Sequence, residues 1–133
     1  MSILVGYVPT PAGEAAVDAG IAEAKLRGEA LLLVNSQREG ALVDKAVASP
    51  EDLGRVEAAA RGAGVDLQVL SSTHSDDLAE EILELAEQHA VSLIVIGLRH
   101  RSQVGKFIMG SHAQRILLQA DRPVLAVKAN SRR

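Results

Sequence analysis

The chain has 133 residues, a length that fits one domain with a substantial hydrophobic core. Hydrophobic residues make up 47% of it and aromatic residues only 2%, which argues against disorder and for a core of Val, Leu, Ile and Ala. The net charge of −3 and the scarcity of aromatic rings for stacking argue against nucleic-acid binding. Because there is no cysteine, disulfides and thiol chemistry are excluded, and a cytoplasmic location is expected.

Membrane attachment and metal binding are not expected either. The apolar start, residues 1–7, is too short for a signal peptide and lacks a basic segment. No apolar run approaches the roughly 20 residues that a membrane-spanning helix needs. The histidines show no paired ligand spacing, which argues against a metal held by the protein alone; they are His74, His89, His100 and His112.

The chain opens with a strand and a helix. Residues 2–8 are mostly apolar and predict a buried strand. Thr10 as N-cap and Pro11 at the first helical position predict a helix start, and Gly28 predicts its end. One face of this helix is expected to be buried; it comprises Ala16, Val17, Gly20, Ile21, Ala24 and Leu26.

The middle of the chain predicts two further strands and a helix. The continuous apolar run at residues 30–34 indicates a second buried strand, ended by the polar residues 35–36, and residues 37–49 show only weak periodicity. Pro50 after a serine predicts a helix start, and Gly62 its end. Residues 65–70 alternate between apolar and polar, which is typical of an edge strand, and a polar connection is expected to follow.

The next helix is expected to be amphipathic, starting near the acidic pair at residues 76–77. Its apolar face is predicted to consist of Leu78, Ile82, Leu85, Ala86 and His89. Its acidic side chains are interpreted as a solvated face rather than a catalytic carboxylate pair; they are Glu80, Glu81, Glu84 and Glu87.

The segment from residue 93 onwards carries the clearest functional signal. Residues 93–96 are predicted to form a strand that is buried on both faces. Residues 97–109 are predicted to form a loop, and Gly110 and Ser111 are predicted to begin a helix. A helix N-terminus beside a glycine-containing basic loop suits a phosphate, but the same features occur in ordinary strand-to-helix connections. The basic side chains of the loop are Arg99, His100, Arg101 and Lys106.

The end of the chain completes an alternating pattern. The last helix is predicted to reach Gln119, and a final apolar strand begins at Val124 and ends at Val127. About five strands alternating with about four helices predict an α/β fold with a parallel sheet and right-handed crossovers.

The spacing of four residues matches a known pattern. Gly97 is followed after two residues by His100, and then after nine residues by Gly110 and Ser111. This resembles the nucleotide signature of the universal stress protein family, in which a glycine stands at the position of His100. Other segments resemble that family as well and extend the resemblance over nearly the whole chain: residues 3–7, 31–34, 79–97 and 122–128.

The resemblance implies one domain over residues 1–133 with an open parallel five-stranded sheet in the order 3-2-1-4-5 and helices on both faces. This is a Rossmann-like, adenine nucleotide α-hydrolase-like architecture. Strand order reverses between the first and fourth strands, and ligands of open sheets bind at such a point, outside the carboxyl ends of the strands. Val8 and Gly97 are both expected there.

The resemblance also implies a function. The expected ligand is ATP or another adenine nucleotide, with magnesium entering only together with the phosphates. The expected role is regulation in a stress response, through a nucleotide-dependent conformation or contacts with a protein partner that the sequence does not specify. A homodimer is expected to pair through the last strand, whose apolar edge is otherwise open.

Two candidate site residues depart from the family pattern. Val8 stands where the family has an Asp that contacts the nucleoside, so only van der Waals or backbone contact is left. His100 either blocks the pocket or points outward or to a phosphate, with Gly105 re-routing the loop. Two roles are left open for the Tyr7 side chain, stacking on a base and ordinary packing. The candidate binding residues are Tyr7, Val8, Val34, Gly97, Arg99, His100, Ser102, Gly105, Lys106, Gly110 and Ser111.

The alternative is a family member that does not bind nucleotide and acts as a dimeric protein-interaction module. A cyclic nucleotide ligand is a variant of the first interpretation. An evolved ATP hydrolase is not expected, because no clear general base and no dedicated metal carboxylate stand at the motif, although slow hydrolysis stays open.

Overall fold

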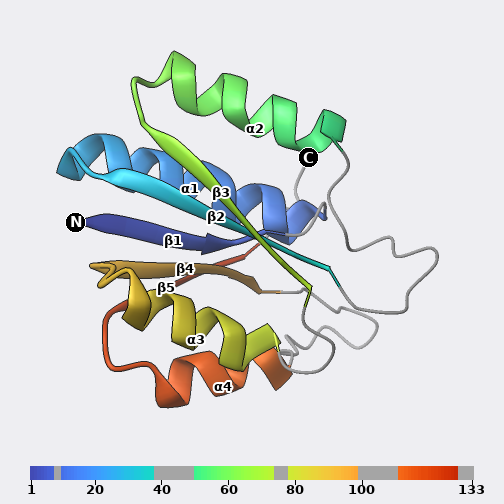
Figure 1. The fold of residues 1–133 in the computed structure, drawn as a ribbon, viewed down its shortest axis with the longest axis vertical. Coiled ribbons are helices and arrows are strands. Elements are labelled where there is room, and N and C mark those ends of the chain that lie inside the picture. Colours follow the sequence, from blue (N-terminus) through green and yellow to red (C-terminus); the bar gives the residue numbers. More distant parts are fainter. Residues whose placement is uncertain (8–9, 38–49, 74–77, 99–110, 129–133) are drawn as a thin grey trace.

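The structure, a computed structural model, describes residues 1–7, 10–37, 50–73, 78–98 and 111–128 (Figure 1). In these ranges strands and helices alternate, and the strands form one parallel sheet in the order β3-β2-β1-β4-β5, which confirms the predicted architecture. The strands are β1 (Ser2–Gly6), β2 (Ala30–Gln37), β3 (Leu67–Thr73), β4 (Leu93–Leu98) and β5 (Val124–Lys128). The helices are α1 (Pro11–Arg27), α2 (Pro50–Gly62), α3 (Leu78–Gln88) and α4 (Ser111–Gln119).

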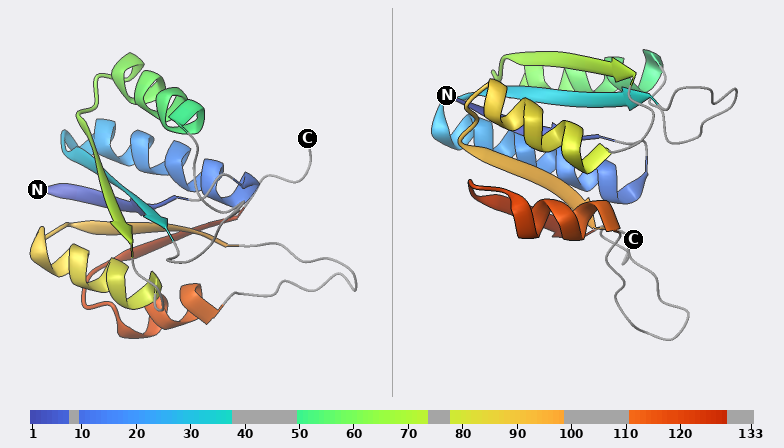
Figure 2. Two further views of the ribbon diagram at one scale, coloured as in Figure 1. Left: turned by 45° about the vertical axis from the view of Figure 1, so that its right-hand side comes forward. Right: turned by 60° about the horizontal axis from the view of Figure 1, so that its bottom comes forward.

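The sheet is covered on both faces, by α1 and α2 on one and by α3 and α4 on the other (Figure 2). Side chains alternate between these layers: Val5 and Leu33 face α1 and α2, whereas Leu4 and Leu32 face the other pair. All four side chains are buried, as expected for strands whose sequences are continuous apolar runs.

Local signals set the limits of α1. Thr10 has an extended backbone and its hydroxyl accepts a hydrogen bond from the Gly13 N–H at 3.1 Å. Gly28 ends the helix in the left-handed conformation, with φ 69°. Both caps were predicted. Leu26 was expected on the buried face but is 81% exposed, so the apolar stripe ends at Ala24.

The strand boundaries differ from the prediction, most clearly in β2, β3 and β4. β2 continues to Gln37, because its polar end pairs with β3, with Asn35 opposite Ser71. β3 therefore runs through residues 71–73, which were expected to be a connection, and starts only at Leu67. β4 extends to Leu98, opposite Lys128 of β5. Polar side chains do not stop a strand whose backbone finds a partner.

The buried surface of α3 is wider than the single apolar stripe that was predicted. Glu81 is only 4% exposed, so its assignment to the solvated face was wrong. His89, expected on the apolar face, is exposed and follows the helix end. The buried arc is wide because α3 packs against α4 as well as against the sheet (Figure 1). Within the described ranges, no helix combines the length and apolar character that crossing a membrane requires.

Candidate functional site

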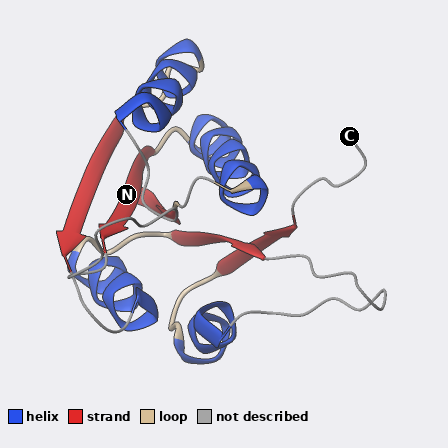
Figure 3. Ribbon diagram, turned by 90° about the vertical axis from the view of Figure 1, so that its right-hand side faces the viewer, coloured by secondary structure: helices blue, strands red, loops and turns tan. Residues whose placement is uncertain are grey.

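The carboxyl ends of β1 and β4 lie side by side in the middle of the sheet. β1 pairs with β4 in parallel, with Val5 opposite Val95. After β1 the chain enters α1 on one face, and the helix that follows β4 is α4 on the other face. Figure 3 looks onto this edge of the sheet, with one pair of helices on each side. The connections therefore diverge here, which is where open parallel sheets bind ligands.

Gly97 brings the end of β4 against the first turn of α1. A Cβ atom on Gly97 would lie 2.2 Å from the carbonyl oxygen of Ala12 and 3.1 Å from the Ala12 Cβ. No side chain fits such a gap, so glycine is required by packing as well as by any ligand. The first residue of the Gly-His-Gly-Ser motif is thus in direct contact with the helix that follows β1.

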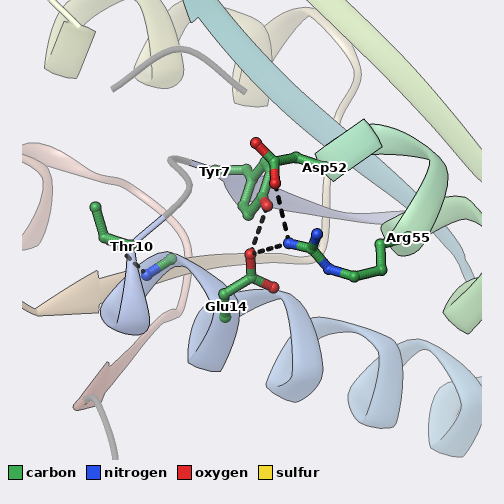
Figure 4. A network of polar contacts seen from close by, with 6 residues as sticks. Tyr7, Thr10, Glu14, Asp52 and Arg55 are labelled. Carbon is green, nitrogen blue, oxygen red and sulfur yellow. Dashed lines mark hydrogen bonds and ion pairs between the residues drawn. The ribbon is translucent and has the colours of Figure 1, made fainter. Parts of the chain in front are cut away.

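Tyr7 follows β1 and packs into the core on the side of α1. Its side chain is buried, its backbone N–H donates to the Val34 carbonyl oxygen at 3.1 Å, and its hydroxyl donates to Glu14 Oε2 at 2.6 Å (Figure 4). Burial and the neighbouring Glu14 carboxylate raise the pKa of Tyr7 well above its ordinary value. Of the two roles left open, the geometry is that of ordinary packing.

Glu14 joins three elements. Besides the Tyr7 hydroxyl, its Oε2 accepts a hydrogen bond from the Arg55 guanidinium of α2 at 2.9 Å (Figure 4). Arg55 also donates to Asp52 Oδ1 at 3.1 Å, and these two bonds raise the pKa of the guanidinium. Sequence reasoning missed this network. Only the acidic residue in the first turn of α1 was visible as a signal, and it is explained equally well by the helix dipole.

Val34 fills the core, as its apolar strand predicts. It is 1% exposed and faces α3 and α4, the opposite side from Tyr7. Its carbonyl oxygen accepts a hydrogen bond from the Tyr7 N–H, so the Val34 backbone lies beside the carboxyl end of β1. The structure thus brings Tyr7, Val34 and Gly97 to one edge.

Of the remaining candidate residues, the structure describes only Ser111, at the end of the motif. Ser111 is the first residue of α4, where a helix start was predicted. The free N–H groups of that helix begin at the same edge of the sheet, because every helix that follows a parallel strand starts at its carboxyl end. Seven candidate residues lie outside the described residues: Val8, Arg99, His100, Ser102, Gly105, Lys106 and Gly110.

The fold and the site define a class. The sheet is doubly wound and Rossmann-like, and its motif begins at the end of β4 and closes at the start of α4. Residues 1–128 match the model of the universal stress protein family. A universal stress protein of Mycolicibacterium smegmatis is 43% identical over 126 residues, which are 95% of this chain and 96% of that protein. The chain belongs to the universal stress protein family.

Solved structures agree with this assignment. The universal stress protein from Archaeoglobus fulgidus superposes with a TM-score of 0.82 at 28% identity, covering 96% of this chain and 98% of that one. A structure of the universal stress protein from Archaeoglobus fulgidus in complex with dAMP superposes with a TM-score of 0.70 at 22% identity, again covering 96% and 98%. This second likeness shows the shared fold.

Proposed function

We propose that this universal stress protein binds an adenine nucleotide at the carboxyl edge of the sheet and regulates a stress response through the bound state. One observation supports the proposal: Gly97 lies near the carboxyl end of β4, which is one of the two strands at the switch point, and Ser111 is the first residue of the helix that follows. A protein of the same fold forms a complex with dAMP, which favours an adenine nucleotide over other anions.

The proposed contacts follow from the chemistry of the residues. The N-terminus of α4 offers N–H groups and the positive end of the helix dipole, which suit phosphate oxygens. In the proposal, the Gly110 N–H and the Ser111 hydroxyl cap the phosphates. Arg99, Ser102 and Lys106 provide charge and further donors, and magnesium binds only with the phosphates. The purine lies toward the backbone of Val34.

The proposed role is binding rather than an evolved hydrolysis of ATP. A hydrolase needs a general base that can take a proton from the attacking water. Glu14 lies near this edge, but its carboxylate already accepts hydrogen bonds from Tyr7 and Arg55. It is therefore poorly suited to that task, and slow turnover is the most that the proposal includes.

The proposal includes a homodimer paired through β5. This strand is the last in the sheet order, and β4 is the one strand of the described residues that pairs with it. Its apolar residues from Val124 to Val127 are only half-buried. Pairing with a second copy across a two-fold axis would satisfy the backbone and cover these side chains.

The test is calorimetric titration with ATP and magnesium after removal of co-purified nucleotide. We expect saturable micromolar binding that weakens at least about tenfold in Ser111→Ala and in Gly110→Val, since a lost charge-assisted hydrogen bond costs roughly 1.5–3 kcal/mol. Ser92→Ala is the matched control, because the Ser92 hydroxyl bonds Glu29 at the opposite end of the sheet.

Titrations with AMP and with a cyclic nucleotide then identify the preferred ligand. If the wild-type protein carries no nucleotide and gives no heat with any of them, the site is closed by Val8 and His100. The protein is then a dimeric interaction module, and the search turns to protein partners.

A further inference from the structure

The first turn of α1 touches the candidate site on one side and α2 on the other. Ala12 lies against the backbone of Gly97, where β4 ends and the motif begins. Within the same turn, Glu14 bonds Tyr7 behind β1 and Arg55 of α2 (Figure 4). A continuous chain of contacts therefore runs from the start of the motif through one helical turn to a helix on the outside of the molecule.

The attachment of α2 is slight. Only Val56 and Ala60 of this helix are buried, and Leu53 packs against the core in part. The ion pair to α1 involves side chains that are 59% exposed for Arg55 and 39% exposed for Glu14. Exposed pairs contribute little to stability, so breaking this one costs only a modest free energy, and its effect is expected in the local opening of α2.

We infer that Glu14 is a positioning residue that links occupancy of the nucleotide site to the attachment of α2. The inference rests on the proposed nucleotide binding. A ligand held between the end of β4 and the start of α4 restrains Gly97, and with it the turn of α1 that carries Glu14. That carboxylate then stays in place for Arg55, and α2 is held more firmly.

The link acts in both directions. If nucleotide strengthens the attachment of α2 by some factor, detaching α2 weakens nucleotide binding by the same factor. Glu14 is suited to this role because the buried Tyr7 hydroxyl fixes its carboxylate from behind, while the exposed Arg55 is free to leave. The opening of α2 is therefore expected to respond to the bound state.

Hydrogen exchange of the full chain with and without ATP and magnesium tests the inference, together with the ATP affinity of each variant. ATP is expected to slow exchange in α2 about three- to tenfold in the wild type, within the usual range of coupling between sites. In Glu14→Ala this slowing is lost and the ATP Kd rises by the same factor. In Glu14→Gln part of both effects returns, because the amide oxygen still accepts hydrogen bonds.

Glu23→Ala is the matched control. Glu23 forms a similar exposed ion pair with Arg27 at the far end of α1. Its loss should change neither the ATP Kd nor the response of α2. A purely structural role of Glu14 would lower the melting temperature but leave the ATP-dependent slowing in place, and that result would overturn the inference.

A second variant separates folding from coupling. Arg55→Met keeps the bond between Tyr7 and Glu14 and removes the link to α2, together with the bond to Asp52 within α2, so it tests the inference if Glu14→Ala does not fold. Normal ATP binding with full slowing of α2 in Arg55→Met would overturn the link while the proposed function stands. A wild type that binds no nucleotide would overturn both.

Discussion

A Cβ atom on Gly97 would lie 2.2 Å from the carbonyl oxygen of Ala12, so β4 and α1 meet through backbone atoms. This contact sets how closely the first helix lies over the fourth strand. It also means that one glycine serves both the packing of the fold and the start of the nucleotide motif. A substitution at Gly97 should therefore be examined first for its effect on the stability of the fold and only then for its effect on nucleotide binding.

Gly97→Ala is expected to lower the free energy of unfolding by about 1–3 kcal/mol, because α1 must move to admit the methyl group. Urea unfolding followed by circular dichroism measures this loss. Gly54→Ala is the control, since Gly54 is exposed within α2 and nothing lies within 4 Å of its missing Cβ. That change should stabilise by up to about 1 kcal/mol. Equal shifts of the same sign in the two variants would refute the contact.

Arg122 holds the end of α3 to the start of β4. One nitrogen of its guanidinium donates to the carbonyl oxygens of Ala86 at 2.9 Å and Val91 at 3.0 Å. The Arg122 side chain is only 18% exposed, so its removal takes a buried donor from both carbonyl groups, although the Ala86 oxygen still accepts from the Val91 N–H at 3.1 Å. Arg122→Met is expected to cost about 1–3 kcal/mol in urea unfolding.

The control for Arg122 is Arg27→Met. Arg27 pairs with the Glu23 carboxylate on its own helix, and the two side chains are 37% and 31% exposed. We expect a loss below about 0.5 kcal/mol. A similar loss in both variants would show that Arg122 acts by its charge and not through the two carbonyl groups.

Sequence reasoning succeeded where structure is encoded locally. The caps at Thr10 and Gly28 and the alternation of apolar runs were enough to give the helices, the parallel sheet and, with the family resemblance, the strand order. It failed where tertiary pairing overrides side-chain character. Asn35 looked like a turn residue, yet its backbone continues β2 because Ser71 of β3 lies opposite.

For the candidate site, the sequence predicted where two of its residues lie in the fold, Gly97 near the end of β4 and Ser111 at the start of α4. Gly97 and Ser111 belong to one contiguous motif, so their spacing was visible and the topology brings them to one edge. Glu14 and Arg55 are 41 positions apart, and only the packing of α2 beside α1 brings them together. No periodicity in the sequence relates the two, which is why this network could not be foreseen.

The proposed dimer makes a direct prediction. Val127→Lys places a charge on the edge strand β5, where pairing with a second strand would bury it. Light scattering should then give a mass near 14.0 kDa, against about twice this value for the wild type. Gln68→Lys, on the opposite edge strand, adds the same charge and should leave the dimer intact. A dimer that survives Val127→Lys in a folded protein would place the interface elsewhere.

Tyr7 predicts how stability changes at high pH. Burial and the Glu14 carboxylate favour the neutral phenol, so the pKa of Tyr7 is raised in the folded state, whereas the unfolded chain titrates near the ordinary value of about 10. Above this pH the folded chain binds more protons than the unfolded chain, and stability falls as the pH rises. The contribution is fully present below pH about 10.

This dependence can be isolated because the chain has one tyrosine and no tryptophan. The unfolding free energy of the wild type should decline more steeply than that of Tyr7→Phe above pH about 10, by up to about 1.4 kcal/mol per pH unit. Lysine and arginine titrate in both proteins, so the difference in slope belongs to Tyr7. Ultraviolet absorbance of tyrosinate gives the same information directly. If tyrosinate forms near the ordinary pKa while circular dichroism still shows a folded protein, the bond between Tyr7 and Glu14 does not hold in solution.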